Sequence, residues 1–177
     1  MAEEEHSSKH ATHAAELWSF AVTLYARPGV GEACLALQDR GGANVPFLLF
    51  VLWLGAGRGV CLSAGDVVGL RAAVAPWHAE VVDQLRALRR RLKNGPPPAP
   101  SAATDALREK IKAAELSAER MELDTLAGLA EGFEPAAVPP SAAEANLALA
   151  LGALVEQDWA AAAAGVLHDA VNAQAIR

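Results

Sequence analysis

Apolar side chains recur every three to four residues through most of the chain, which is the spacing of amphipathic α-helices. The longest stripe contains Trp77, Val81, Leu85, Leu88 and Leu92, and it predicts a helix over residues 76–93. Aromatic residues make up only 5% of the sequence, and alanine is abundant, so that the composition also favours helix over sheet. We therefore expect an all-α protein, a bundle of about seven or eight helices.

One predicted helix, residues 45–56, is apolar on every side instead of along one stripe. A bilayer core is about 30 Å thick and needs about 20 apolar residues to cross. The uncharged run here is shorter, because Arg40 and Arg58 bound it and two glycines precede the helix. A helix of this kind must be covered by protein all round. We expect it to be the central helix of the bundle and expect no membrane association; the alternatives are an interfacial segment or a helix that also lines an apolar ligand cavity.

Capping residues and helix breakers set the other expected boundaries. Residues 1–11 are polar and acidic and are expected to form a disordered tail. Asn44 is placed to cap the central helix, with Pro46 tolerated in its first turn. Ser63 and Asp66 have the spacing of a capping box. Pro76 is expected to end one helix and start the next.

A proline-rich stretch, residues 94–103, divides the expected single helical domain of residues 12–177. It has no side chains for a core and is expected to be an extended linker. The N-terminal helical core would then be residues 12–93, and residues 104–177 would form acidic C-terminal helices. The final helices are expected after Ser141, and a break near Gln157 is left open.

The charge is distributed unevenly along the chain, whose net charge is -6. Residues 1–93 carry ten basic and nine acidic side chains, whereas residues 94–177 carry five basic and twelve acidic. The acidic part argues against nucleic-acid binding, which needs clustered cations. The basic run RALRRRLK, residues 86–93, has two interpretations: it contacts phosphate, or it complements its own helix C-terminus and an acidic helix of the same chain. We favour the second.

Signals for catalysis or metal binding are scarce. Nucleotide-binding, nucleophile-elbow and zinc-protease motifs are missing, so we assign no catalytic residue and expect no cofactor. His6, His10 and His13 have helical spacing, but they fall in the expected tail, and we expect no metal there. Cys34 and Cys61 are isolated, and no secretory signal is evident, so a reducing, cytoplasmic compartment is expected.

Several short motifs together resemble a family of short proteobacterial proteins, the domain of unknown function 2390 family. They are LW at 17–18, LYARPGV at 24–30, CLALQD at 34–39, LLF and WLG within 48–55, and PW at 76–77. The resemblance is clear over residues 17–93 and looser beyond. It implies a small, cytoplasmic, helical protein and brings no established activity.

Two kinds of function fit these observations. The first is a non-enzymatic interaction or adaptor module, with a protein partner or a second copy bound to the acidic helices across a proline-rich hinge. The alternative is a small-molecule binding protein or enzyme with an apolar pocket around Trp53. The candidate ligand-binding residues are Trp18, Tyr25, Gln38, Asp39, Arg40, Asn44, Phe50, Trp53 and Arg58.

Overall fold

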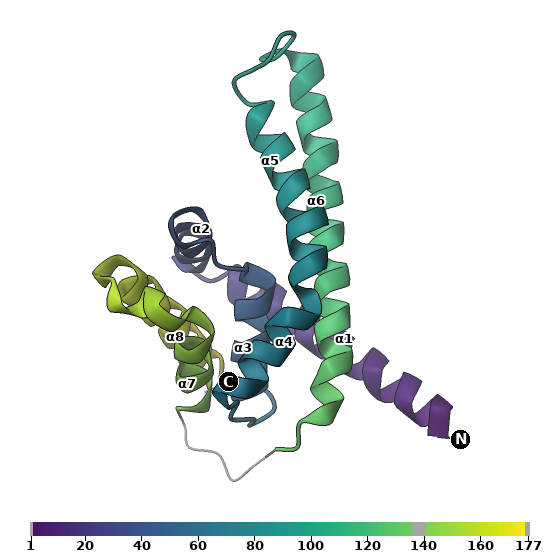
Figure 1. The fold of residues 1–177 in the computed structure, drawn as a ribbon, viewed down its shortest axis with the longest axis vertical. Helices are drawn as coiled ribbons and strands as arrows, with labels where there is room; N and C mark the ends of the chain where they lie inside the picture. The colour runs from purple at the N-terminus through teal and green to yellow at the C-terminus, as the bar shows by residue number, and fades with distance from the viewer. Residues whose placement is uncertain (1, 136–140, 176–177) are drawn as a thin grey trace.

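The computed structural model describes residues 2–135 and 141–175, and all regular secondary structure in these residues is helical. The predicted all-α class is therefore confirmed. Figure 1 shows a body of packed helices from which one helical pair, α5 and α6, projects. The elements are α1 (Ala2–Tyr25), α2 (Val30–Gly41), α3 (Val45–Ala56), α4 (Ala64–Trp77), the π-helix η1 (His78–Val82), α5 (Asp83–Arg91), α6 (Ala102–Leu129), the short 3-10 helix η2 (Ala130–Gly132), α7 (Ala142–Leu151), the 3-10 helix η3 (Gly152–Glu156) and α8 (Asp158–Ala175).

The apolar helix α3 lies at the centre of the body, as predicted. Every residue from Val45 to Gly55 is buried. Helices α1, α2, α6, α7 and α8 all contact it, so that protein covers each of its sides. Asn44 caps the helix by accepting a hydrogen bond from the Phe47 amide at 3.0 Å, and Pro46 lies in the first turn. Of the helices described, none combines the length and the apolar character needed to cross a membrane.

Helix α7 packs closely against α3 because both helices carry small residues at their contact. A Cβ added to Gly55 would lie 2.5 Å from the backbone of Ala143, so only glycine permits this approach. Next to this contact the fully buried Asn146 donates hydrogen bonds to the carbonyls of Val51 and Val60 and accepts one from the Leu62 amide. These three bonds attach α7 to the end of α3 and to the loop after it.

The chain continues as one helical path from α4 through η1 into α5, which differs from the break expected at Pro76 (Figure 1). Proline lacks an N–H and its ring crowds the preceding turn. The following five residues, His78–Val82, widen into a π-helix, and this local change of register keeps the path helical. The capping box of Ser63 and Asp66 at the start of α4 is confirmed.

The proline-rich stretch is the tip of a helical hairpin, and it does not hold two helical portions apart as expected. Helix α6 begins at Ala102, where Ser101 and Thr104 cap each other reciprocally. From there α6 runs back along α5, and the two helices form an arm that extends beyond the body (Figure 1). We call α5, the loop of residues 92–101 and the first half of α6 the arm. Ion pairs between α5 and α6 hold the two helices against each other.

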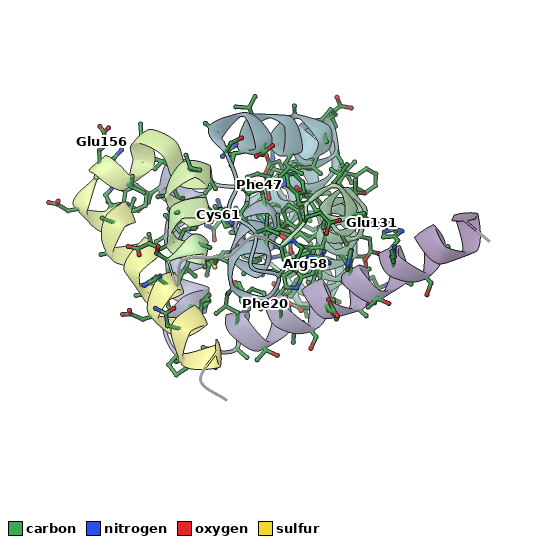
Figure 2. The ribbon with its side chains drawn as sticks, turned by 90° about the horizontal axis from the view of Figure 1, so that it is seen from below. Phe20, Phe47, Arg58, Cys61, Glu131 and Glu156 are labelled. Atoms are coloured by element: carbon green, nitrogen blue, oxygen red, sulfur yellow. The ribbon has the colours of Figure 1, made fainter. Side chains whose placement is uncertain are left out.

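The N-terminal end of the described chain departs from the sequence-based expectation, and the C-terminal end answers a question that the sequence left open. Helix α1 begins at Ala2, so residues 2–11, expected to be a disordered tail, are helical. Their first turns extend beyond the body (Figures 1 and 2), and His10 Nε2 donates to the carbonyl of Asp124 in α6 at 2.9 Å. This contact, together with the continuous packing of α1 further along, lets the helix propagate toward the N-terminus. The break near Gln157 that the sequence left open is present: α7 ends before Gly152, whose φ is 55°, the 3-10 helix η3 follows, and Gln157 is extended immediately before α8.

Candidate functional site: a groove between the arm and the body

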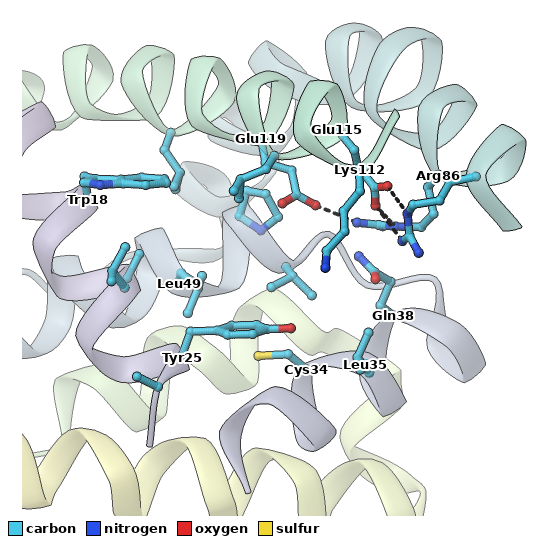
Figure 3. Close-up of a pocket in the computed structure, with 18 residues that line it drawn as sticks. Trp18, Tyr25, Cys34, Leu35, Gln38, Leu49, Arg86, Lys112, Glu115 and Glu119 are labelled. Atoms are coloured by element: carbon cyan, nitrogen blue, oxygen red, sulfur yellow. Dashed lines mark hydrogen bonds and ion pairs between the residues drawn. The ribbon is translucent and has the colours of Figure 1, made fainter. Parts of the chain in front are cut away.

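A groove with a volume of about 500 Å³ lies where the arm meets α1, α2 and the start of α3 (Figure 3). Its size falls in the range of pockets that hold small organic ligands. Most of its lining is apolar, and the polar groups gather at one end. The lining residues are Trp18, Ala21, Val22, Tyr25, Ala26, Cys34, Leu35, Gln38, Val45, Pro46, Leu49, Arg86, Arg89, Lys112, Glu115, Leu116, Glu119 and Leu123.

The apolar wall comes mainly from α1. Trp18, Ala21, Val22 and Tyr25 are three and four residues apart, so they share one face of this helix and present it to the groove. The guanidinium of Arg120 lies 4.7 Å from the Trp18 ring centroid and fixes that end of the wall by a cation–π contact. The wall is therefore a preformed apolar surface.

Four apolar side chains at the edge of the groove are roughly half exposed to solvent. Val22 and Tyr25 lie on α1, Leu35 on α2 and Leu116 on α6, and their exposed fractions range from 42% to 55%. Single exposed apolar residues are common on protein surfaces, but a group of them around one opening is typical of a binding site. The groove thus offers apolar contact from its edge down to the buried Leu49.

The polar end is held together by ion pairs between α5 and α6. Arg86 donates to Glu115 at 2.9 Å and to Glu119 at 2.6 Å, and Arg89 donates to both oxygens of Glu115 at 2.5 and 3.0 Å. This arrangement confirms the expectation that the basic run finds its counter-charge in an acidic helix of the same chain. It also means that two of the cations at the polar end are already paired.

The two carboxyl groups of this network have pKa values shifted in opposite directions. Burial on its own raises the pKa of Glu115, but the hydrogen bond and charge of Arg89 and the nearby Arg86 outweigh it, and the net pKa is lowered. Burial raises the pKa of Glu119, and Arg86 opposes this only in part. Glu115 is therefore the strong anion of the pair, and Glu119 holds its proton more readily than an ordinary glutamate.

Two further groups at the polar end are not part of this network. Lys112 is an exposed cation that pairs with Glu109, one turn before it, at 3.9 Å. The amide nitrogen of Gln38 is buried, and no acceptor in the described residues lies within hydrogen-bonding distance. Figure 3 shows the Lys112 and Gln38 side chains at the same end of the groove, opposite Trp18. The polar end therefore has donors available.

Cys34 and Tyr25 lie side by side on the wall formed by α1 and α2 (Figure 3). Burial raises the pKa of the Cys34 thiol to about 12 and also raises the pKa of the Tyr25 hydroxyl. Both groups stay protonated at neutral pH. They contribute surface to the groove, and Cys34 is not an activated nucleophile.

The structure brings three of the nine sequence-predicted ligand residues to this groove and places the other six elsewhere. Trp18, Tyr25 and Gln38 line it. Phe50 and Trp53 are buried within the core. Asp39, Arg40, Asn44 and Arg58 make separate contacts, so the nine residues do not form one pocket.

Asp39 and Arg40, at the end of α2, contact different parts of the molecule. Asp39 pairs with Arg90 of α5 and so joins α2 to the arm. The guanidinium of Arg40 lies 4.1 Å from the ring centroid of Trp159 in α8. Both contacts fix the position of α2, which carries one wall of the groove.

Arg58 and His13 cover the edge of Trp53. The guanidinium of Arg58 lies 5.6 Å from the Trp53 ring centroid and donates to His13 Nε2, while the His13 ring meets Trp53 edge-on at 5.9 Å. Burial and the positive charge of Arg58 lower the pKa of His13. His10 and His13 thus have different partners, and the His6 side chain lies outside the described residues.

Asn44 belongs to a buried polar network beneath the groove. Its Nδ2 donates to one oxygen of Glu122 at 2.5 Å, and Nδ1 of His78 donates to the other at 2.9 Å. The Glu122 residue is 1% exposed. The π-helix places His78, and the cap of α3 places Asn44, on opposite sides of this carboxyl group. The network therefore fixes α3, α6 and η1 relative to one another.

The lining residues contributed by α5 and α6 were not predicted from the sequence. The signal was present, because Glu115 and Glu119 are four residues apart and opposite charges were expected to meet the basic run. Treating residues 94–103 as a linker instead of a hairpin tip removed the arm from the predicted site. Cys34 was not a candidate either, and its position at the groove depends on the packing of α2 against α1.

Comparison with known proteins gives one match. The family described as "Protein of unknown function (DUF2390)" matches residues 16–126. No curated protein and no solved structure matches the chain. Every residue that lines the groove falls inside the matched range, whereas α7 and α8 lie beyond it. The groove is therefore part of the region that the family description covers.

Proposed function

The chain belongs to the DUF2390 family of proteins of unknown function, and from this premise we propose that it is a binding protein for a small, largely apolar molecule held in the groove. The observation that carries the proposal is the groove itself, which has a volume of about 500 Å³, a mainly apolar lining and polar groups at one end. Burial of an apolar ligand there removes its surface from water and supplies the affinity.

The construction of the groove supports ligand binding more than catalysis. The charged groups at its end are largely committed to one another, because Arg86 and Arg89 share Glu115. Cys34 is not an activated nucleophile, and both oxygens of Glu115 and one oxygen of Glu119 accept hydrogen bonds from arginines. The two cysteines are free, which suits the reducing, cytoplasmic setting that forms part of this proposal.

A fluorescence titration tests the proposal directly. The probe N-phenyl-1-naphthylamine brightens when it leaves water for an apolar site, and we expect saturable binding by the full chain. Leu116→Glu puts a charge at the groove edge and should weaken probe binding roughly tenfold or more. Met121→Glu is the matched control, because Met121 lies on the same helix, is 56% exposed against 55% for Leu116, and does not line the groove. Equal affinity for both variants, or no saturable binding, refutes the proposal.

A protein partner is the second candidate function. The observation that favours it is the group of half-exposed apolar side chains around the groove, Val22, Leu35 and Leu116, which an amphipathic helix would cover. A second copy of the chain is one such partner. Sedimentation velocity of the wild type and of Leu116→Glu tests self-association: a dimer that dissociates in the variant supports a second copy as the partner, and a monomer in both contradicts self-association.

A further inference from the structure

The acceptors at the polar end of the groove are mostly occupied. Three of the four carboxylate oxygens of Glu115 and Glu119 accept hydrogen bonds from Arg86 or Arg89. Burial also raises the pKa of Glu119. A ligand head group that donates hydrogen bonds or carries a positive charge therefore finds little to bind here.

The donors at the same end are available. Among the residues that the structure describes, Lys112 pairs with Glu109 at 3.9 Å, and the buried amide nitrogen of Gln38 has no acceptor. The terminal torsion of a glutamine is soft, so a small rotation turns this amide toward a ligand in the groove. The charges of the lining residues also favour an anionic head group, because three cations line this end and only two carboxyl groups do.

Resting on the proposed function, we infer that the ligand is an amphiphile with a carboxylate head and an apolar tail. The head lies against Lys112 and Gln38, and the tail follows the apolar lining toward Leu49 and Trp18, which Figure 3 shows at the opposite end of the groove. A charge-assisted hydrogen bond from Lys112 supplies selectivity for the charged head, and the apolar wall accepts any tail of suitable length.

Three ligands with the same tail and different heads test this inference by displacement of N-phenyl-1-naphthylamine from the full chain. They are dodecanoate, 1-dodecanol and dodecylamine, each used at pH 8 and below its micelle or solubility limit. We expect dodecanoate to bind roughly tenfold more tightly than 1-dodecanol, and dodecylamine to bind most weakly.

Two lysine variants locate the head group. Lys112→Gln should bring the affinity for dodecanoate to within about twofold of that for 1-dodecanol. Lys110→Gln makes the same charge change on the same helix away from the groove and should leave the preference intact. Because both positions are on the surface of α6, neither change disturbs the core.

The outcomes separate this inference from the proposed function. Equal binding of dodecanoate and 1-dodecanol, or a preference that survives Lys112→Gln, overturns the carboxylate assignment while the apolar groove stands. Failure of all three ligands to displace a probe that does bind also overturns the inference and keeps the groove. Absence of any saturable probe binding overturns the proposed function and the inference with it.

Discussion

Nδ1 of His78 lies 2.9 Å from Oε2 of Glu122, and this pair joins the π-helix to the C-terminal half of α6. Glu122 is 1% exposed, and its other oxygen accepts from Asn44 at the cap of α3. A single buried carboxyl group therefore holds three segments that are distant in sequence. The groove lies directly above them, since Val45 and Pro46 follow Asn44, and Glu119 and Leu123 flank Glu122.

Removing this carboxyl group should destabilise the fold strongly. Glu122→Ala leaves the Asn44 amide and the His78 ring without their buried acceptor, and we expect a loss of about 3–5 kcal/mol in the free energy of unfolding. Glu122→Gln retains one acceptor and the side-chain volume, and should lose less. Urea denaturation measures both, with Met121→Ala as the exposed neighbouring control. A loss below about 1 kcal/mol for Glu122→Ala would contradict the structural role assigned to this network.

Alanine substitutions at two helical glycines should change the stability in opposite directions, because one glycine lies at the close contact between α3 and α7 and the other lies in open space. Gly55→Ala places a Cβ 2.5 Å from the Ala143 backbone and should destabilise the protein by about 3 kcal/mol. Gly69→Ala lies in the interior of α4, where nothing is within 4 Å of the new Cβ, and should stabilise it by about 0.5–1 kcal/mol. Thermal and urea unfolding of the two variants check the signs, and a stable Gly55→Ala variant would show that the helices are not this close.

The ion pairs of Glu115 predict a defined dependence of stability on pH. Because the pKa of folded Glu115 lies below its ordinary value of 4.5, its contribution is present above that pH and is lost as the pH falls through the folded value. The difference in unfolding free energy between wild type and Glu115→Gln should thus be largest near neutral pH and shrink below about pH 4.5.

The matched control for this experiment is Glu109→Gln on the same helix. Glu109 is exposed and lies 3.9 Å from Lys112, so its pair contributes little at any pH. Urea unfolding from pH 3 to pH 8 compares the three proteins. If the difference in unfolding free energy between wild type and Glu115→Gln stays constant over this range, the ionised carboxylate is excluded as the source of the stabilisation.

The two cysteines should differ sharply in reactivity. Cys61 is exposed, whereas Cys34 is buried with its pKa raised to about 12, so on the order of one Cys34 thiol in ten thousand is ionised at pH 8. We expect a thiol reagent such as 5,5′-dithiobis(2-nitrobenzoate) to modify one cysteine quickly in the folded protein and both in guanidinium chloride. In Cys61→Ser the fast phase should disappear. A fast phase that persists in that variant would mean that Cys34 is accessible.

Sequence periodicity was sufficient for the helices and for the core position of α3, because each depends on local spacing and on burial of a fully apolar surface. The reciprocal cap at Ser63 and the cap at Asn44 were also predictable, since they involve residues three apart. The continuity of the helix through Pro76 was not predictable from the sequence, because the π-helix that permits it is stabilised by contacts with α6. Trp77 donates to the Ala118 carbonyl, and His78 binds Glu122.

The candidate site was likewise predictable only in part from the sequence. Trp18, Tyr25 and Gln38 were chosen from the sequence and do line the groove, but the six other choices contact separate neighbours. Their separation depends on the directions in which α2, α3 and α8 cross, which residue spacing does not specify.

The sequence by itself determined that this chain is helical, where most of its helices begin, and that residues 45–56 must be enclosed by protein. These properties follow from interactions within one helix or from the removal of apolar side chains from water. Only the tertiary structure decided that the proline-rich stretch is a hairpin tip, that Glu115 meets Arg86 and Arg89, and that the arm and body enclose a groove. Those features require helices distant in sequence to pack at particular angles, and the free energy that selects the angles comes from contacts formed only after the chain has folded.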